Sequence, residues 1–370
     1  MMQVNTVDEL ISDIRQGRMV VLLDDDADSH NEGVVMVAAE HCDADHVNFM
    51  ARQARGLVCL TLTEERCRQL DLPPMVDDAL GEKSNFTLSI EATVGIDTGI
   101  SAADRARTVL AAVAPHAVPS DIVQPGHIFP LAVVPGGVLV RAGHTEAASD
   151  YARLAGLLPA AVIADILTPA GDVADGPALV EFAAKHQLKI GTIADLIHFR
   201  MVNERTVHRV REGNINTAYG EFQLTAYRDD NAGEIHLALS QGEISPEEPT
   251  LVRVHVKSAL RDLVGSELPG NPTWSMDRCM KKVADAGRGV IVLLAREEGP
   301  EQLLASVNMA LGEPAVGDGM TPDPYTTVGL GSQILRDLGV GKIHLMGAPI
   351  KYNAISGFDL EVLDFVNPAS

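Results

Sequence analysis

The stretch Met19-Val-Val-Leu-Leu23, followed by Asp24-Asp-Asp-Ala-Asp-Ser-His-Asn-Glu-Gly33, sets the fold class of the first half of the chain. Five consecutive apolar residues that end in an acidic, turn-forming segment predict a short buried strand. The polar residues after it predict a loop, and loops that leave strand ends commonly carry functional side chains. Upstream, Thr6 and Glu9 form a capping-box pattern, which predicts a helix over residues 7–16 that stops at Gly17. A helix followed by a buried strand indicates an α/β domain.

The same patterns continue along the chain. Further strands are predicted at residues 57–63, 86–91, 137–140, 162–167, 251–256, 289–294 and 342–345, and helices at 102–113, 150–158, 177–186, 193–202 and 331–338. Helices and strands alternate without a strict repeat, so we expect an α/β (α+β) protein with a mixed sheet. The polar stretch 203–213 predicts a linker, which gives domains 1–205 and 206–370.

Composition excludes several classes of partner. The 370 residues carry a net charge of −22, which repels nucleic acid and acidic membrane surfaces. No apolar run is long enough to cross a bilayer, and the first ten residues do not resemble a secretion signal, so we expect a cytoplasmic protein. The four cysteines show no metal-binding spacing and are expected to be free thiols.

Four segments combine residue types that packing alone does not require: 25–33, 98–105, 124–130 and 141–146. The first three also have a structural interpretation, respectively a solvated acidic turn, a capped helix start and a rigid turn with one structural histidine. The last segment groups Arg141, His144 and Thr145 after a predicted strand, which favours a site for phosphate and metal.

In this order and spacing, the segments resemble the 3,4-dihydroxy-2-butanone 4-phosphate synthases of riboflavin biosynthesis. The resemblance runs over residues 7–200 and includes LDLPPMV at 70–76, NFTLSIEA at 85–92, TGISAADR at 98–105, PSDIVQPGHIFPL at 119–131 and RAGHTEA at 141–147. It implies a homodimeric lyase that converts ribulose 5-phosphate through an enediol, with release of formate and with magnesium or manganese as cofactor.

The resemblance also implies roles for individual residues. Those implied to take part in catalysis are His127, Asp165, Glu32 and Cys59; those implied to bind substrate are Asp25, Ser29, His30, Thr98, Arg105, Arg141, Gly143 and Thr145; those implied to bind metal are His144 and His30. Cys59 could equally be a small buried hydrophobe on a strand.

The acidic loop departs from the family pattern. The family reads Asp-Asp-Glu-Asp-Arg-Glu-Asn-Glu-Gly-Asp, and this chain has Ser29 for the Arg, His30 for the metal-binding Glu and Val34 for the last Asp. Imidazole suits a transition metal better than magnesium, so a different metal, or none, is an open alternative. Loss of the Arg and the Asp removes two polar contacts to a sugar phosphate.

Two interpretations therefore remain open. In the first, the domain is a lyase on ribulose 5-phosphate or a related sugar phosphate, or a repurposed homologue with another metal and substrate in a specialised pathway. In the second, it is a non-catalytic dimeric scaffold or regulator of riboflavin metabolism. We favour a catalyst because His127, His144, Arg141 and Cys59 are all retained.

From residue 222 onward the chain is similar to GTP cyclohydrolase II. The positions of the three zinc cysteines of that family read Ser258, Pro269 and Asn271, and none of these side chains supplies a thiolate. The loop Glu297-Glu-Gly-Pro-Glu301 lacks the family Arg, and Val328 replaces a family Tyr. We therefore expect no zinc and no cyclohydrolase activity in this domain. Lys351 matches a nucleotide-binding Lys of the family, but a solvated surface lysine is the simpler interpretation.

Overall fold

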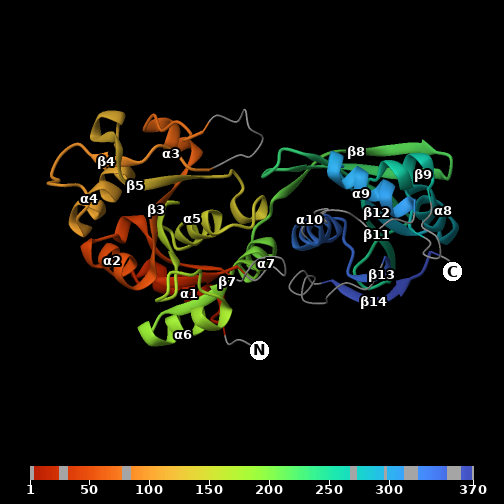
Figure 1. Ribbon diagram of the computed structural model, residues 1–370. Coiled ribbons are helices and arrows are strands. Elements are labelled where there is room, and N and C mark those ends of the chain that lie inside the picture. Colours follow the sequence, from red (N-terminus) through yellow and green to blue (C-terminus); the bar gives the residue numbers. More distant parts are fainter. Residues whose placement is uncertain are drawn as a thin grey trace. The chain divides into compact units, whose positions relative to one another are not determined.

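The computed structural model describes residues 4–24, 32–76, 85–266, 273–295, 298–311, 324–347 and 360–368 (Figure 1). The chain divides into two compact units, Met1–Phe199 and Arg200–Ser370. Each unit has its own seven-stranded sheet, and both sheets mix parallel with antiparallel neighbours. The expected mixed α/β architecture is confirmed, whereas the boundary between residues 205 and 206 stays a prediction.

The elements of the first unit are α1 (Val7–Arg15), β1 (Val20–Leu23), β2 (Gly33–Ala38), α2 (Ala44–Phe49), β3 (Arg55–Thr63), α3 (Glu64–Gln69), β4 (Ile90–Ala92), α4 (Ala102–Val113), β5 (Ile122–Val133), α5 (His144–Leu154), β6 (Ala161–Ile166), α6 (Gly176–His186), β7 (Lys189–Thr192) and α7 (Ile193–Asn203), which runs into the second unit. The sheet order is β4-β5-β3-β6-β2-β1-β7. The pairs β3–β5 and β1–β7 are parallel, and the other neighbours are antiparallel.

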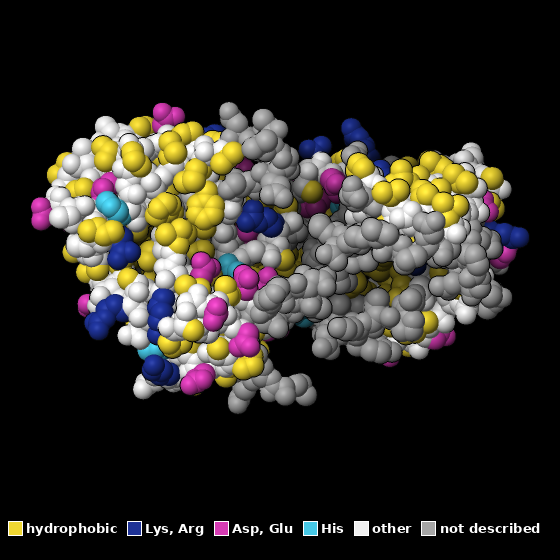
Figure 2. All heavy atoms as spheres, in the orientation of Figure 1, with side chains coloured by type: hydrophobic (Ala, Val, Ile, Leu, Met, Phe, Trp, Pro, Cys, Tyr) yellow, Lys and Arg dark blue, Asp and Glu magenta, His cyan; other side chains and the backbone are white. Residues whose placement is uncertain are grey.

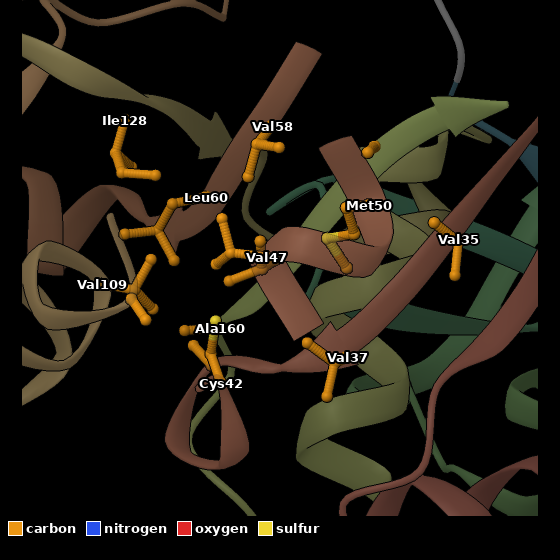
Figure 3. Close-up of a cluster of buried hydrophobic side chains, with 14 of the residues drawn as sticks. Val35, Val37, Cys42, Val47, Met50, Val58, Leu60, Val109, Ile128 and Ala160 are labelled. Carbon is orange, nitrogen blue, oxygen red and sulfur yellow. The ribbon is translucent and has the colours of Figure 1, made fainter. Parts of the chain in front are cut away.

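Helices cover both faces of the first sheet. Helix α5 packs along β1, β2, β3, β5 and β6 with α1 beside it. On the opposite face Leu179 of α6 lies against Gly33, where an added Cβ would come within 2.6 Å of the leucine. That face also holds an apolar cluster, which includes Val35, Val58, Leu60 and Val109 and is shown in Figure 3. Because β1 and β2 are buried on both faces, their sequences are continuously apolar rather than alternating.

Two predicted elements of the first unit are wrong. Residues 137–140 form no strand, because Gly136 and Gly137 both take positive φ (92° and 62°) and start a 3₁₀ turn at Gly137–Leu139. The following helix begins at His144 rather than at residue 150, and it ends earlier, at Leu154. The segment 141–146 therefore follows a turn and opens a helix.

The second unit contains β8 (Val207–Thr217), β9 (Gly220–Asp229), β10 (Ile235–Gln241), β11 (Thr250–Val256), a π-helical segment (Ala259–Val264), α8 (Met276–Ala286), β12 (Gly289–Leu294), α9 (Pro300–Ala310), α10 (Pro324–Asp337), β13 (Lys342–Met346) and β14 (Glu361–Val366). Its sheet order is β14-β13-β11-β12-β10-β9-β8. Trp274, Cys279 and Ile291 belong to its apolar cluster. The predicted linker is wrong over most of its length, because residues from Val207 onward form the exposed edge strand β8, which pairs with β9.

The visible surface of the first unit carries charges of both signs. On the visible side of the first unit, acidic and basic side chains are interspersed (Figure 2). Among the helices that the structure describes, none has the length and apolar character needed to span a bilayer. All four cysteines are buried and free, as expected.

Candidate active site

Several predicted site residues meet at one end of the first sheet. Strand β1 ends at Leu23 and β2 starts at Gly33, and these two residues pair. The backbone N–H of Asp24 donates to the carbonyl of Glu32 (2.9 Å), which closes the base of the loop between the strands. Asp165, near the end of β6, pairs with Val34 of β2. The sheet therefore brings Asp24, Glu32 and Asp165 together.

Residues 25–31 lie outside the described part of the chain. The roles predicted for Asp25, Ser29 and His30 therefore stay predictions. Position 34, where the family has Asp, can be described. Val34 is apolar and 1% exposed, so its side chain offers no polar group to a ligand.

His144 is the first residue of α5 and faces these carboxylates. Burial lowers its pKa, while the charges of Asp24, Asp165 and Glu32 oppose that shift. The imidazole also bonds the backbone of Glu32, whereas its Nε2 atom is buried and has no hydrogen-bond partner. Nε2 is thus a ring nitrogen without a partner in the protein. A neutral histidine with an unpaired ring nitrogen beside carboxylates is suited to bind a divalent cation.

A β-bulge next to Asp165 fixes the position of that residue. Arg55 pairs with Ile166 and Val58 with Ala164, so Gly56 and Leu57 both lie opposite Asp165. A Cβ on Gly56 would come within 2.3 Å of the Asp165 carbonyl oxygen, so only glycine fits there. Although Asp165 is exposed as a residue, partial burial of its carboxylate raises its pKa, with Glu32 adding to the shift and His144 opposing it. A carboxylate with a raised pKa is a candidate general base.

Cys59 lies on β3 next to Asp165 but is not activated. Burial, followed by the charge of Asp165, raises the pKa of its thiol to about 12. The side chain is 5% exposed. A neutral, buried thiol is a poor nucleophile, so the role consistent with this geometry is to line the site.

The start of α5 also holds the predicted phosphate contacts. Arg141 Nε lies 3.4 Å from Glu146 Oε2, and Glu146 is fully buried, which raises its pKa. Among the described residues, Glu146 is the one ion-pair partner of Arg141. Thr145 Oγ1 accepts a hydrogen bond from Asn85 (3.3 Å). Gly143 is the N-cap, and a Cβ there would come within 2.8 Å of Glu146 Oε2, so glycine leaves room for this carboxylate.

A second group of residues surrounds His127 on β5. Its Nδ1 lies 3.1 Å and 3.3 Å from the two carboxylate oxygens of Glu91, on β4. Asp165 and His127 stand on the two strands that flank β3, about 10 Å apart across the sheet. Glu91 is a functional candidate that sequence reasoning missed; the available signal was one acidic residue within the apolar strand segment 85–92.

The turn before α4 packs against the Glu91 carboxylate at Gly99. The Asp104 carboxylate accepts hydrogen bonds from the backbone N–H groups of Asp97, Thr98 and Gly99 (3.3, 3.2 and 3.0 Å). Gly99, at φ +77°, lies so close that a Cβ would be 1.4 Å from Glu91 Oε1. Arg105 is half-buried and its Nε has no partner, and burial lowers its pKa. Thr98 thus lies next to Gly99 in the turn that contacts Glu91, whereas the contacts above do not connect Arg105 with Glu91 or His127, and the roles of both residues stay predictions.

Together these features define a two-unit α/β protein whose first unit has a histidine and several carboxylates at one end of a mixed sheet. A family model described as 3,4-dihydroxy-2-butanone 4-phosphate synthase matches residues 8–199, and one described as GTP cyclohydrolase II matches residues 208–367. The 3,4-dihydroxy-2-butanone 4-phosphate synthase of Pseudomonas aeruginosa is 54% identical over 366 residues, with 99% of each chain covered.

Solved structures agree with this. RibBX, a two-domain 3,4-dihydroxy-2-butanone 4-phosphate synthase from A. baumannii, matches with a TM-score of 0.82 and 47% identity, covering 98% of this chain and 99% of that one. A 3,4-dihydroxy-2-butanone 4-phosphate synthase in complex with two magnesium ions matches with a TM-score of 0.51 and 38% identity, covering 54% of this chain and 98% of that one. The chain belongs to the 3,4-dihydroxy-2-butanone 4-phosphate synthase family, with a GTP cyclohydrolase II-type second domain.

Proposed function

We propose that the first unit is a 3,4-dihydroxy-2-butanone 4-phosphate synthase-type lyase that converts ribulose 5-phosphate, through an enediol, to a four-carbon ketone phosphate and formate. The observation that carries the proposal is the unpaired His144 Nε2 among Asp24, Glu32 and Asp165. Among the described residues no three histidine, cysteine, aspartate or glutamate side chains are placed to hold a metal ion by themselves. His144 Nε2 would therefore be one ligand of a divalent cation, which when bound would polarise the adjacent oxygens of a sugar. Magnesium or manganese follows from the family, and the predicted contribution of His30 would favour a transition metal.

The protein side chains then divide the proton transfers. Asp165, whose pKa is raised, is suited to accept the proton whose removal forms the enediol. His127, oriented by Glu91, is suited to donate a proton to the departing hydroxyl group. The backbone N–H groups at the start of α5, with Arg141 and Thr145, favour a phosphate there. Product and formate together contain the atoms of the substrate, so no external oxidant is needed.

The test is formate release from ribulose 5-phosphate by the full chain with magnesium, manganese, zinc or no added metal. We expect metal-dependent release that H127A lowers by at least ~100-fold and H144A abolishes, and that the control H116A, at an exposed histidine, retains. Binding of manganese to wild type and H144A, followed by electron paramagnetic resonance, separates metal binding from turnover. Absence of formate with every metal would reject the lyase and leave the scaffold interpretation. We propose a homodimer, which light scattering on the full chain tests.

We also propose that the second unit holds no zinc and does not hydrolyse GTP. Ser258, at the position of a zinc cysteine, donates a hydrogen bond to Glu298 Oε1 (3.2 Å), and the backbone N–H of Ala259 donates to Oε2 (2.8 Å). The neutral hydroxyl is thus used inside the protein, while Pro269 and Asn271 lie outside the described residues. Zinc content by plasma emission spectroscopy and pyrophosphate release from GTP test this proposal.

A further inference from the structure

A cavity of about 210 Å³ lies within the second unit, between helix α10 and strands β11 and β13. Its walls are mainly aliphatic and include Val254, Val328, Leu335 and Leu345. Val328 is the residue that replaces a tyrosine of the family that this unit resembles. The polar side chains on its lining are few, and two of them are not satisfied within the protein.

The first is Arg253 on β11. Its Nη1 donates to the carbonyl of Met346 (2.7 Å), whereas its Nε is buried and has no partner. Within the described chain no carboxylate forms an ion pair with Arg253. Asp262 is near enough to favour its charge, but that carboxylate is already bonded to His255, Arg261 and the backbone of Ser258. A guanidinium desolvated without a bonded anion is costly to keep in a folded protein.

The second is Thr327 on α10, whose Oγ1 is also buried without a partner and lines the same cavity. A buried donor left unpaired destabilises the folded protein, and native structures hold few of them, so two on one small cavity indicate a missing partner. Gly347 completes the setting, because a Cβ there would lie 3.2 Å from Arg253 Nη1 and restrict the guanidinium. Arg253 lines the cavity, and a guanidinium carries parallel donors of the kind that a carboxylate binds in a bidentate manner.

We infer that this cavity is a binding site for a small, mainly apolar carboxylate. Its carboxylate would bind the guanidinium of Arg253 and accept from Thr327, and its apolar body would lie against the aliphatic walls. The mainly aliphatic lining suits a small apolar acid better than a nucleotide, whose several negative charges would lie against apolar walls. A phosphate ester is a poorer match, because two negative charges would face one cation in an apolar setting. The site is independent of the reaction proposed for the first unit.

The probe is 3-phenylpropanoate, with 3-phenylpropan-1-ol as its neutral counterpart, titrated by calorimetry against the full chain. We expect the acid to bind at least ~10-fold more tightly than the alcohol, since one charge-assisted pair contributes about 1.5–3 kcal/mol. R253M should weaken binding of the acid by ~10-fold or more, and T327V by a few-fold. The control R228M, at an exposed arginine of the same unit, should leave binding unchanged.

Three outcomes would overturn the inference. They are no binding of the acid at millimolar concentration, equal binding of acid and alcohol, and binding by R253M equal to that of wild type. If R253M does not fold, as judged by its thermal melt, the nearly isosteric T327V and the alcohol still decide. Loss of binding in R228M equal to that in R253M would show that the acid associates with the surface in general.

Discussion

The pair formed by Glu91 and His127 supports a quantitative prediction, tested by a double-mutant cycle with E91A, H127A and the double variant. The two oxygen–nitrogen distances are 3.1 and 3.3 Å, and the side chains are 13% and 41% exposed. A hydrogen bond to a charged group contributes about 1.5–3 kcal/mol, which solvent at the exposed histidine reduces to about 1 kcal/mol. At about 1.4 kcal/mol per tenfold change in rate, E91A should lower kcat about 5-fold.

The larger effect belongs to the histidine. General acid–base catalysis contributes ~10²–10⁴ in rate, so H127A should lose at least ~100-fold. Because Glu91 acts on the reaction only through His127, the double variant should be no slower than H127A within about 2-fold.

The assay is formate release at saturating ribulose 5-phosphate, with thermal melts to confirm folding. E181Q, at an exposed carboxylate of α6, is the control and should behave as wild type. Multiplication of the two single effects in the double variant would refute the reasoning, because Glu91 would then act without His127.

Three further predictions follow from the structure. G99A should reduce kcat at least as far as E91A, because its Cβ would displace the Glu91 carboxylate; G171A, also at positive φ but with open space around it, is the control for backbone strain of about 1–2 kcal/mol. All four thiols should react with Ellman's reagent only in denaturant, since each is buried and the pKa of Cys59 is raised to about 12; rapid labelling of the native chain would contradict this. The second unit should lose about 3 kcal/mol of stability as the pH falls from 6.5 to 4, because burial lowers the pKa of His255 to about 4 and the unfolded chain therefore takes up a proton first; H255Q should flatten this dependence in urea titrations.

Much of the fold follows from the sequence where local signals agree with the tertiary structure. The helix Ala102–Val113 and the strand Gly289–Leu294 have the predicted bounds, since Ser101 caps the first and the second is a continuous apolar run. The apolar run at 137–140 misleads, because a short run does not distinguish a strand from a turn. The start of α5 at His144 gives little signal, because Gly143 makes no side-chain capping bond.

Some residues of the candidate site could likewise be recognised from the sequence, and others could not. His127, His144 and Asp165 stand in recognisable segments, whereas Glu91 gains meaning only when the sheet places it beside His127, 36 residues later in the chain. The raised pKa of Asp165 likewise depends on partial burial and on neighbours from other strands. Sequence patterns identify candidate residues, and tertiary pairing assigns their partners.

The hydrogen bond between Asp24 and Glu32 has an evolutionary consequence. The pairing of β1 with β2 already ends at Leu23 and Gly33. The register of the two strands therefore does not depend on which seven residues lie between Asp24 and Glu32. If the segment binds metal or substrate as predicted, a change of its sequence would alter that preference while the strand pairing on either side is kept. A lineage can then acquire new chemistry without first having to find a new fold.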